Sequence, residues 1–187
     1  MKINMILAVG PNDIVGLKDK MPWHSKKDFF HFKHITLNKP CIFGKNTFFG
    51  LPKYPLKNRL NIVLDNELPE STVLASDDGY FTVGTLSKAL NMCKAYDECY
   101  ICGGVSLFKY CLKEGLVDEV ILTRVDSASL VEDDRLNPDK YIKFDKFDEL
   151  LNKNYKLDAF IEYITDEYLK LKEDSDIKVN YVKYIKK

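Results

Sequence analysis

One acidic residue in the chain shares a predicted helical turn with two phenylalanines. Asp28 precedes Phe29 and Phe32, and positions i, i+1 and i+4 can share one inward-facing side of a helix. A carboxylate on such a face can bind a cationic or donor-rich heteroaromatic ligand between the two rings. Ser25 and Asp28 also form a capping-box pattern, which would make the acid part of a helix start. The residues alone leave both interpretations open.

Two glycine-led helix starts could receive a phosphate. Residues 40–44 form a short apolar run that ends on Gly44, and residues 98–102 precede Gly103 and Gly104. In each case a segment with helical spacing follows. The first turn of a helix presents unpaired N–H groups to an anion, and glycine allows close approach of the backbone. Either unit alone could equally be a simple turn.

The composition favours one domain that acts on small molecules. The chain has 187 residues, of which 45% are hydrophobic, so we expect a single compact domain over residues 1–187. Basic and acidic residues both number 28, and no long basic stripe indicates a nucleic-acid partner. The first apolar run is too short for a signal segment, and no later stretch is long enough to span a membrane. We therefore expect a cytoplasmic protein.

Five cysteines are scattered at positions 41, 93, 99, 102 and 111. An odd, scattered set is typical of small buried side chains in a reducing compartment. Cys99 and Cys102 form a CxxC pair, but a second pair and a nearby histidine are missing from the sequence around it. This pattern argues against a metal site, and we expect none.

The order of apolar runs and breaker residues predicts an α/β fold. Alternating strands and helices favour a central, mostly parallel twisted sheet flanked by helices. A loop should follow the first strand from residue 10 and continue to residues 21–23, because glycine, proline, asparagine and aspartate cluster at its start. We expect strands within residues 2–10, 40–44, 60–64, 71–81, 98–102 and 117–125, and helices over residues 25–36, 45–52, 85–93 and 105–112.

The C-terminal part should end in an antiparallel hairpin. Residues 168–172 and 177–185 alternate like strands, and the polar residues 172–176 between them indicate a loop. Residues 141–165 have a spacing compatible with one or two short helices. The segment from residue 139 to about 165 is acidic and aromatic, and it could be a surface addition or a partner-docking element.

In order and approximate spacing, several of these motifs resemble the dihydrofolate reductase family. The resemblance extends from residue 1 to about residue 140, and the C-terminal hairpin follows it more loosely. The matching motifs are Met21-Pro22-Trp23, Asp28, the turn over residues 36–40, Gly44 with Thr47, Arg59 before the strand at 60–64, Gly103-Gly104, and Ile121-Leu122-Thr123.

The resemblance implies reduction of 7,8-dihydrofolate to 5,6,7,8-tetrahydrofolate, which supplies one-carbon and thymidylate metabolism. Hydride would pass from NADPH to C6 of the pterin, and N5 would gain a proton. Asp28 would anchor the pterin ring, and Thr123 would hydrogen-bond that carboxylate. Because N5 lies far from the carboxylate in family members, the proton would arrive through water admitted beside Met21 and Trp23. Phe108 belongs to the same implied catalytic set.

The resemblance also assigns two sets of binding residues. For the substrate, Arg59 would bind the glutamate carboxylate and the apolar residues would enclose the two rings. The substrate set is Ile6, Leu7, Asp28, Phe29, Phe32, Leu51, Leu56, Arg59 and Thr123. The cofactor set is Ala8, Val15, Gly16, Gly44, Lys45, Asn46, Thr47, Leu64, Asp65, Asn66, Cys102, Gly103, Gly104, Val105, Ser106 and Leu107. In the family the peptide between the paired glycines is cis.

Three positions differ from the family pattern. Asp65 stands where a serine near the adenosine 2′-phosphate is common, and Asn66 stands where a basic residue is common. An acid there repels a phosphate, while Lys45 still offers a cation, so we expect NADPH with NADH as a possible substitute. Phe108 replaces a tyrosine found in many members, which should tune the rate without abolishing it.

Two other functions are compatible with the residues. A reductase of the same fold could act on another pterin or on a riboflavin-pathway pyrimidine, although Phe32 and Arg59 suit an aryl-glutamate tail better. A folate-binding structural protein could keep the pocket without turnover. On the favoured interpretation the protein is a monomer whose substrate is dihydrofolate, inhibited by diaminopyrimidine or pteridine antifolates, with no nucleic-acid or membrane partner.

Overall fold

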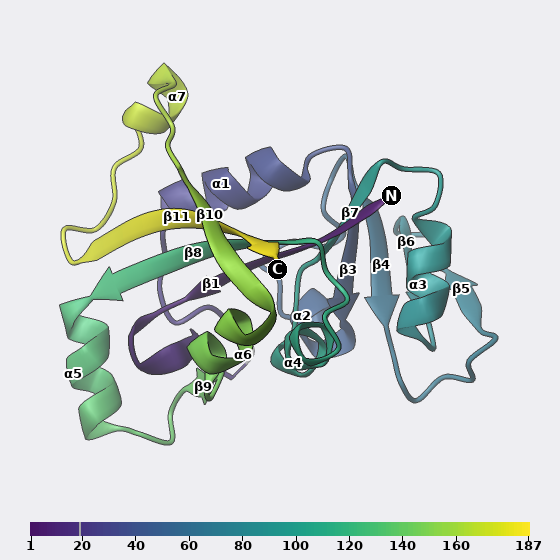
Figure 1. Cartoon of the computed structure of the whole chain (residues 1–187), viewed down its shortest axis with the longest axis horizontal. Helices are drawn as coiled ribbons and strands as arrows, with labels where there is room; N and C mark the ends of the chain where they lie inside the picture. Colours follow the sequence, from purple (N-terminus) through teal and green to yellow (C-terminus); the bar gives the residue numbers. More distant parts are fainter. Residues whose placement is uncertain (19) are drawn as a thin grey trace. The chain divides into compact units, whose positions relative to one another are not determined.

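The computed structural model describes residues 1–18 and 20–187 (Figure 1). By its backbone packing the chain divides into two compact units. Unit 1 comprises Met1–Ile6 and Thr36–Asp118, and unit 2 comprises Leu7–Ile35 and Glu119–Lys187. Strand β1 (Lys2–Val9) runs from the first unit into the second. The expectation of one domain over residues 1–187 stays a prediction.

Unit 1 contains the predicted parallel sheet. The N-terminal part of β1 pairs with β7 (Glu98–Ile101), which is followed across the sheet by β3 (Pro40–Gly44), β4 (Leu60–Leu64) and β6 (Tyr80–Val83), all parallel. A short strand, β5 (Val73–Ala75), adds antiparallel to β6. The helices of this unit are α2 (Lys45–Phe49), α3 (Leu86–Met92) and α4 (Val105–Lys113).

Continuous apolar runs explain why these strands lie inside unit 1. Parallel strands covered on both faces need hydrophobic side chains at consecutive positions rather than at alternate ones. Ile42, Ile62, Val63 and Ile101 are all completely buried. The strand and helix predictions over residues 40–64 and 98–112 are therefore confirmed in type, while residues 71–81 contribute to two strands instead of one.

Unit 2 contains three strands that pair antiparallel to one another. β8 (Glu119–Ser127) pairs with β11 (Ile177–Lys186), which pairs with β10 (Tyr155–Ile161). Two short strands, β2 (Ile14–Gly16) and β9 (Ile142–Lys143), form a separate pair. The helices are α1 (Lys26–Thr36), α5 (Ala128–Leu136), α6 (Phe147–Asn154) and α7 (Asp166–Leu169), with a short 3-10 turn at Pro11–Asp13.

The C-terminal hairpin exists, but its first strand was predicted wrongly. β11 pairs with residues 155–161, and Tyr168 and Leu169 lie in α7, which extends away from the paired strands in Figure 1. A register shift between Leu157 and Ala159 interrupts the alternation of β10, so its pattern imitates a helix. Thr165 caps α7 by accepting a hydrogen bond from the Tyr168 N–H at 3.3 Å.

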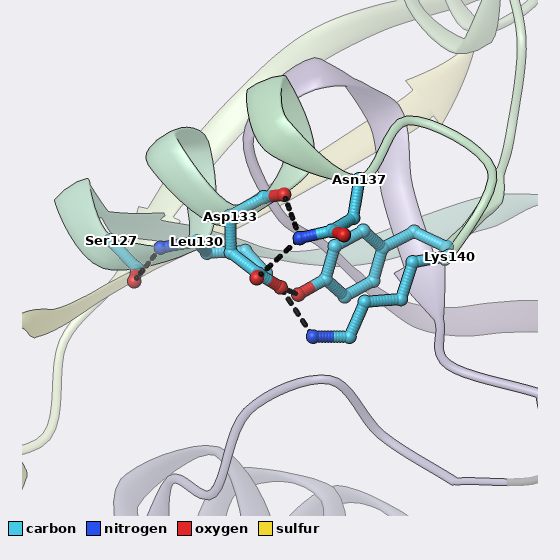
Figure 2. A network of polar contacts seen from close by, with 6 residues as sticks. Ser127, Leu130, Asp133, Asn137 and Lys140 are labelled. Carbon is cyan, nitrogen blue, oxygen red and sulfur yellow. Dashed lines mark hydrogen bonds and ion pairs between the residues drawn. The ribbon is translucent and has the colours of Figure 1, made fainter.

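Helix α5 was also missed, and a polar network defines both of its ends. Ser127 caps the helix by accepting a hydrogen bond from the Leu130 N–H at 3.2 Å. Figure 2 shows Asp133 near the other end, where it accepts hydrogen bonds from Asn137 and Lys140 at 3.1 and 2.5 Å. These contacts fix the chain that follows β8.

Within the described residues, no helix is both long and apolar enough to cross a membrane.

Candidate active site

The backbone and the side chain of Asp28 have different partners. The Asp28 N–H donates to Ser25 Oγ at 2.9 Å, so the serine caps α1 as the capping-box pattern predicted. The Asp28 carboxylate hydrogen-bonds with Thr123, a buried residue in the middle of β8. The serine half of the predicted capping box is therefore confirmed, and ligand binding by the Asp28 carboxylate stays a prediction.

The surroundings of Asp28 raise the pKa of its carboxyl group. Burial raises the pKa of Asp28 from its ordinary value of 3.8 to about 6, and the negative charge of Glu173 adds to this rise. Hydrogen bonding to Thr123 opposes it, and the Trp23 indole opposes it more weakly. At pH 7 the carboxylate is mainly ionised, and a cationic or proton-donating ligand would stabilise it further.

Trp23 packs tightly beside this acid. Its side chain is 8% exposed, and the weak interaction of its indole nitrogen with the Asp28 carboxylate falls short of full hydrogen-bond geometry. A Cβ atom at Gly10 would lie 2.9 Å from Trp23 Cζ3, so only glycine at position 10 lets the ring approach this closely. The preceding Met21 is 39% exposed. The loop therefore places one buried aromatic ring and one accessible thioether near the start of α1.

The apolar residues predicted around Asp28 differ in their exposure. Phe32 and Ala8 are half-buried and Leu7 is buried, whereas Phe29 is 41% exposed and packs against the His24 ring at a centroid distance of 5.4 Å. The expected burial of Phe29 on the inward face is wrong, because the residue after Asp28 lies about 100° further around the helix. Its ring is accessible to a ligand.

In unit 1, the two glycine-led turns lie against each other. The Gly44 N–H donates to the Gly103 carbonyl oxygen at 2.6 Å, and the Gly103–Gly104 peptide is cis, as the resemblance implies. A Cβ at Gly104 would lie 2.6 Å from Thr47 Oγ1, and one at Gly103 would lie 2.9 Å from Thr47 Cγ2. Glycine is therefore required at both positions, and α4 begins without a side-chain cap.

The predicted cation near the adenosine site has two acidic partners. Lys45 Nζ lies 2.8 Å from Asp65 Oδ2 and 3.0 Å from Glu67 Oε2. Hydrogen bonding to these carboxylates raises the pKa of Lys45, and Lys45 in turn lowers the pKa of Asp65. Glu67 was not predicted as a partner of Lys45, because the cofactor positions that the resemblance assigns on this strand end at Asn66. The Asn66 side chain is exposed. The three charged groups sum to one negative charge.

Arg59 lies in a turn that a buried asparagine holds. Its Nε donates to Thr36 Oγ1 at 2.9 Å. Asn61 binds the same turn, because its amide oxygen accepts from the Leu56 N–H and its amide nitrogen donates to the Leu56 carbonyl, both at 2.9 Å. Asn61 was not predicted as a positioning residue, because a single polar residue inside an apolar run only interrupts the strand pattern.

The other predicted residues are distributed as follows. In unit 1, Ile6, Leu107 and Phe108 are buried, Leu51, Leu64, Cys102 and Val105 are half-buried, and Asn46 and Ser106 are exposed. In unit 2, Gly16 is buried and Val15 half-buried. All five cysteines are free thiols, and no group of three metal-ligating side chains occurs among residues 1–18 and 20–187.

Comparison with known proteins gives a consistent result. The family model described as "Dihydrofolate reductase" matches residues 2–169. A dihydrofolate reductase of Neisseria gonorrhoeae is 34% identical over 139 residues, covering 74% of this chain and 80% of the relative. Dihydrofolate reductase type 9 of Escherichia coli is 30% identical over 175 residues, covering 90% of this chain and 89% of the relative.

A solved structure has the same fold. The dihydrofolate reductase from Enterococcus faecalis, complexed with NADP(H) and RAB-propyl, superposes with a TM-score of 0.71. The match covers 99% of this chain and 96% of that chain at 21% sequence identity. This confirms the predicted α/β architecture with its mostly parallel sheet and antiparallel hairpin.

Replacing Asp28 by asparagine should stabilise the folded protein at neutral pH. Because burial raises the pKa of Asp28 to about 6, the folded state retains a proton that the unfolded state releases, and stability falls as the pH rises from about 4 to about 6. A shift of this size corresponds to about 3 kcal/mol, and an uncharged asparagine should regain about 1–3 kcal/mol of unfolding free energy at pH 8. Urea unfolding measures the difference.

The gain should shrink toward zero at about pH 2–3, where the aspartic acid is neutral in both states. Asp77→Asn, in an exposed turn, is a matched control that should change the unfolding free energy by less than about 0.5 kcal/mol. Loss of stability in Asp28→Asn at pH 8 would contradict the assigned environment.

Proposed function

The chain belongs to the dihydrofolate reductase family, and we propose that it performs the family's reaction with Asp28 as the anchor of the pterin ring. It is an oxidoreductase that reduces 7,8-dihydrofolate to 5,6,7,8-tetrahydrofolate with NADPH. The observation that carries the proposed role of Asp28 is a carboxylate enclosed by Thr123 and Trp23 at the start of a helix, with a pKa raised to about 6. The capping bond to Ser25 comes from the Asp28 backbone N–H, which leaves the carboxylate available for a ligand.

The ionised carboxylate of Asp28 suits the donor pattern of a pterin. It can accept two parallel hydrogen bonds, from the 2-amino group and from the adjacent ring nitrogen, which fixes the orientation of the ring. Its negative charge also favours the positive charge that protonation at N5 creates. We assign Met21 and Trp23 to the loop that admits the water through which this proton arrives.

The residues of unit 1 fit a dinucleotide cofactor. The close contact of Thr47 with Gly103 and Gly104 leaves no space for side chains at the turn before α4. The first N–H groups of α4 can therefore bind a pyrophosphate directly. When bound, NADPH supplies the hydride for C6. In the same unit we assign Leu51, Leu56 and Arg59 to the aryl-glutamate tail of the substrate.

The other partners follow from the same chemistry. A protonated diaminopyrimidine offers two parallel donors to Asp28, so we expect such antifolates to compete with dihydrofolate. The expectations of a monomer, of a cytoplasmic location and of no nucleic-acid partner stay predictions.

Dihydrofolate-dependent oxidation of NADPH tests the proposed role of Asp28. Asp28→Asn should lower the hydride-transfer rate at pH 7 by about 100-fold or more, because the variant loses the charge that favours protonation at N5. The rate should recover partly in acid, where the substrate is protonated beforehand, while NADPH affinity should stay unchanged. Full activity of the variant at pH 7 would restrict Asp28 to capping α1. A folded wild-type protein without activity would indicate one of the two other functions.

The contacts of Lys45 predict weak discrimination between NADPH and NADH. Because Asp65 and Glu67 neutralise the lysine and leave one negative charge, a 2′-phosphate gains little there. Replacing both acids, with Asp65→Ser and Glu67→Gln, should raise kcat/KM for NADPH by about 10-fold, equivalent to about 1.4 kcal/mol of transition-state stabilisation. The value for NADH, which lacks the phosphate, serves as the internal control. A strong NADPH preference in the wild type, unchanged in the double variant, would contradict this account.

A further inference from the structure

A distant acidic residue contacts the first turn of α1. Glu173 lies between α7 and β11, and its Oε1 accepts a hydrogen bond from the Lys27 N–H at 2.8 Å. Lys27 and Glu173 are 146 residues apart in the sequence. The next N–H group, that of Asp28, donates to Ser25 Oγ at 2.9 Å. Two consecutive N–H groups of this turn are therefore bound by side chains, one local and one from the C-terminal segment.

The second oxygen of Glu173 distinguishes this contact from an ordinary helix cap. Oε2 is buried and makes no hydrogen bond to any described residue. A carboxylate that only capped a helix could leave its second oxygen in water at little cost, whereas a buried, unpaired oxygen is unfavourable. Its charge acts on the neighbouring Asp28. We therefore expect Glu173 to influence ligand binding by Asp28 in addition to capping the helix.

The groups around Asp28 include few that could cancel this charge. On α1 itself, Lys27 places its ammonium over the Tyr168 ring, 5.2 Å from the centroid, and burial lowers the pKa of His31 to about 4, so His31 is neutral. From β11, Tyr181 is a neutral phenol whose pKa burial raises. Thr123 from β8 and the Trp23 indole carry no charge. Among the described groups that act on Asp28, Glu173 is therefore the acidic one.

We propose that Glu173 is a positioning residue for dihydrofolate reduction, which holds the first turn of α1 and sets the pH range over which Asp28 binds a cationic ring. This inference rests on the proposed function. A second negative charge beside Asp28 favours its protonated form, so removal of that charge should keep Asp28 ionised to lower pH. The C-terminal segment would in this way act on substrate binding without contacting the substrate.

The test is the pH dependence of the affinity for 2,4-diaminopyrimidine, measured by calorimetry. In the wild type, affinity should fall below about pH 6 as Asp28 becomes protonated. Glu173→Gln can still accept the hydrogen bond from Lys27 but has no charge, so its acidic limb should move to lower pH by about 0.5–1 unit. The limb of kcat/KM for dihydrofolate should move in the same direction.

Two control variants separate this role from capping and from general charge effects. Ser25→Ala removes the neighbouring cap and should lower the Tm while leaving the acidic limb in place. Asp174→Asn removes an exposed charge next to Glu173 and should shift the limb less than Glu173→Gln does. A Glu173→Gln protein with the wild-type Tm and an unmoved limb would overturn the inference. Absence of the limb in the wild type would instead count against the proposed function.

Discussion

The proposed chemistry of this protein depends on one carboxylate, that of the half-buried Asp28, which the fold partly removes from water. Asp28 loses hydration at the start of α1, and Thr123 compensates only part of that loss. Such a group destabilises the folded protein at neutral pH. Ser25 fixes the helix start, and Gly10 allows Trp23 to close over one side. A ligand with two hydrogen-bond donors and a positive charge replaces the stabilisation by water that the carboxylate loses on burial.

In the proposed function unit 1 has a different task, which is to bind an anionic cofactor with backbone groups. Gly103 and Gly104 are needed because Thr47 leaves no space for a Cβ atom, and α4 starts with N–H groups that no side chain caps. Charge is used sparingly in this unit. Lys45, the cation that would suit a phosphate best, is shared between Asp65 and Glu67. Affinity for the cofactor should therefore come mainly from the backbone.

Local sequence signals predicted most of the fold. The buried parallel strands of unit 1 read as continuous apolar runs, and Ser25 marked a helix start that the structure confirms. The hairpin was misassigned because the register shift at Leu157 and Ala159 breaks the two-residue period. Helix α5 was missed because its cap, Ser127, is also the last residue of β8.

The site was predictable only where its residues belong to short motifs. Asp28 and the paired glycines stand in recognisable local patterns, whereas Glu67, Asn61 and Glu173 act through contacts that the local pattern does not show. Glu173 is the clearest example, since 146 residues separate it from the turn that it holds. Long-range side-chain to backbone contacts of this kind have no periodicity, and a single sequence does not reveal them.

The central claim is that burial makes Asp28 an acid poised near neutral pH. Carbon-13 NMR titration of the aspartate carboxyl groups in the ligand-free protein measures this directly, with Asp28→Asn identifying the resonance. We predict a midpoint at about pH 6 for Asp28. A midpoint near 4, the value of a solvated aspartate, would contradict the account and would indicate that the carboxylate is exposed to water.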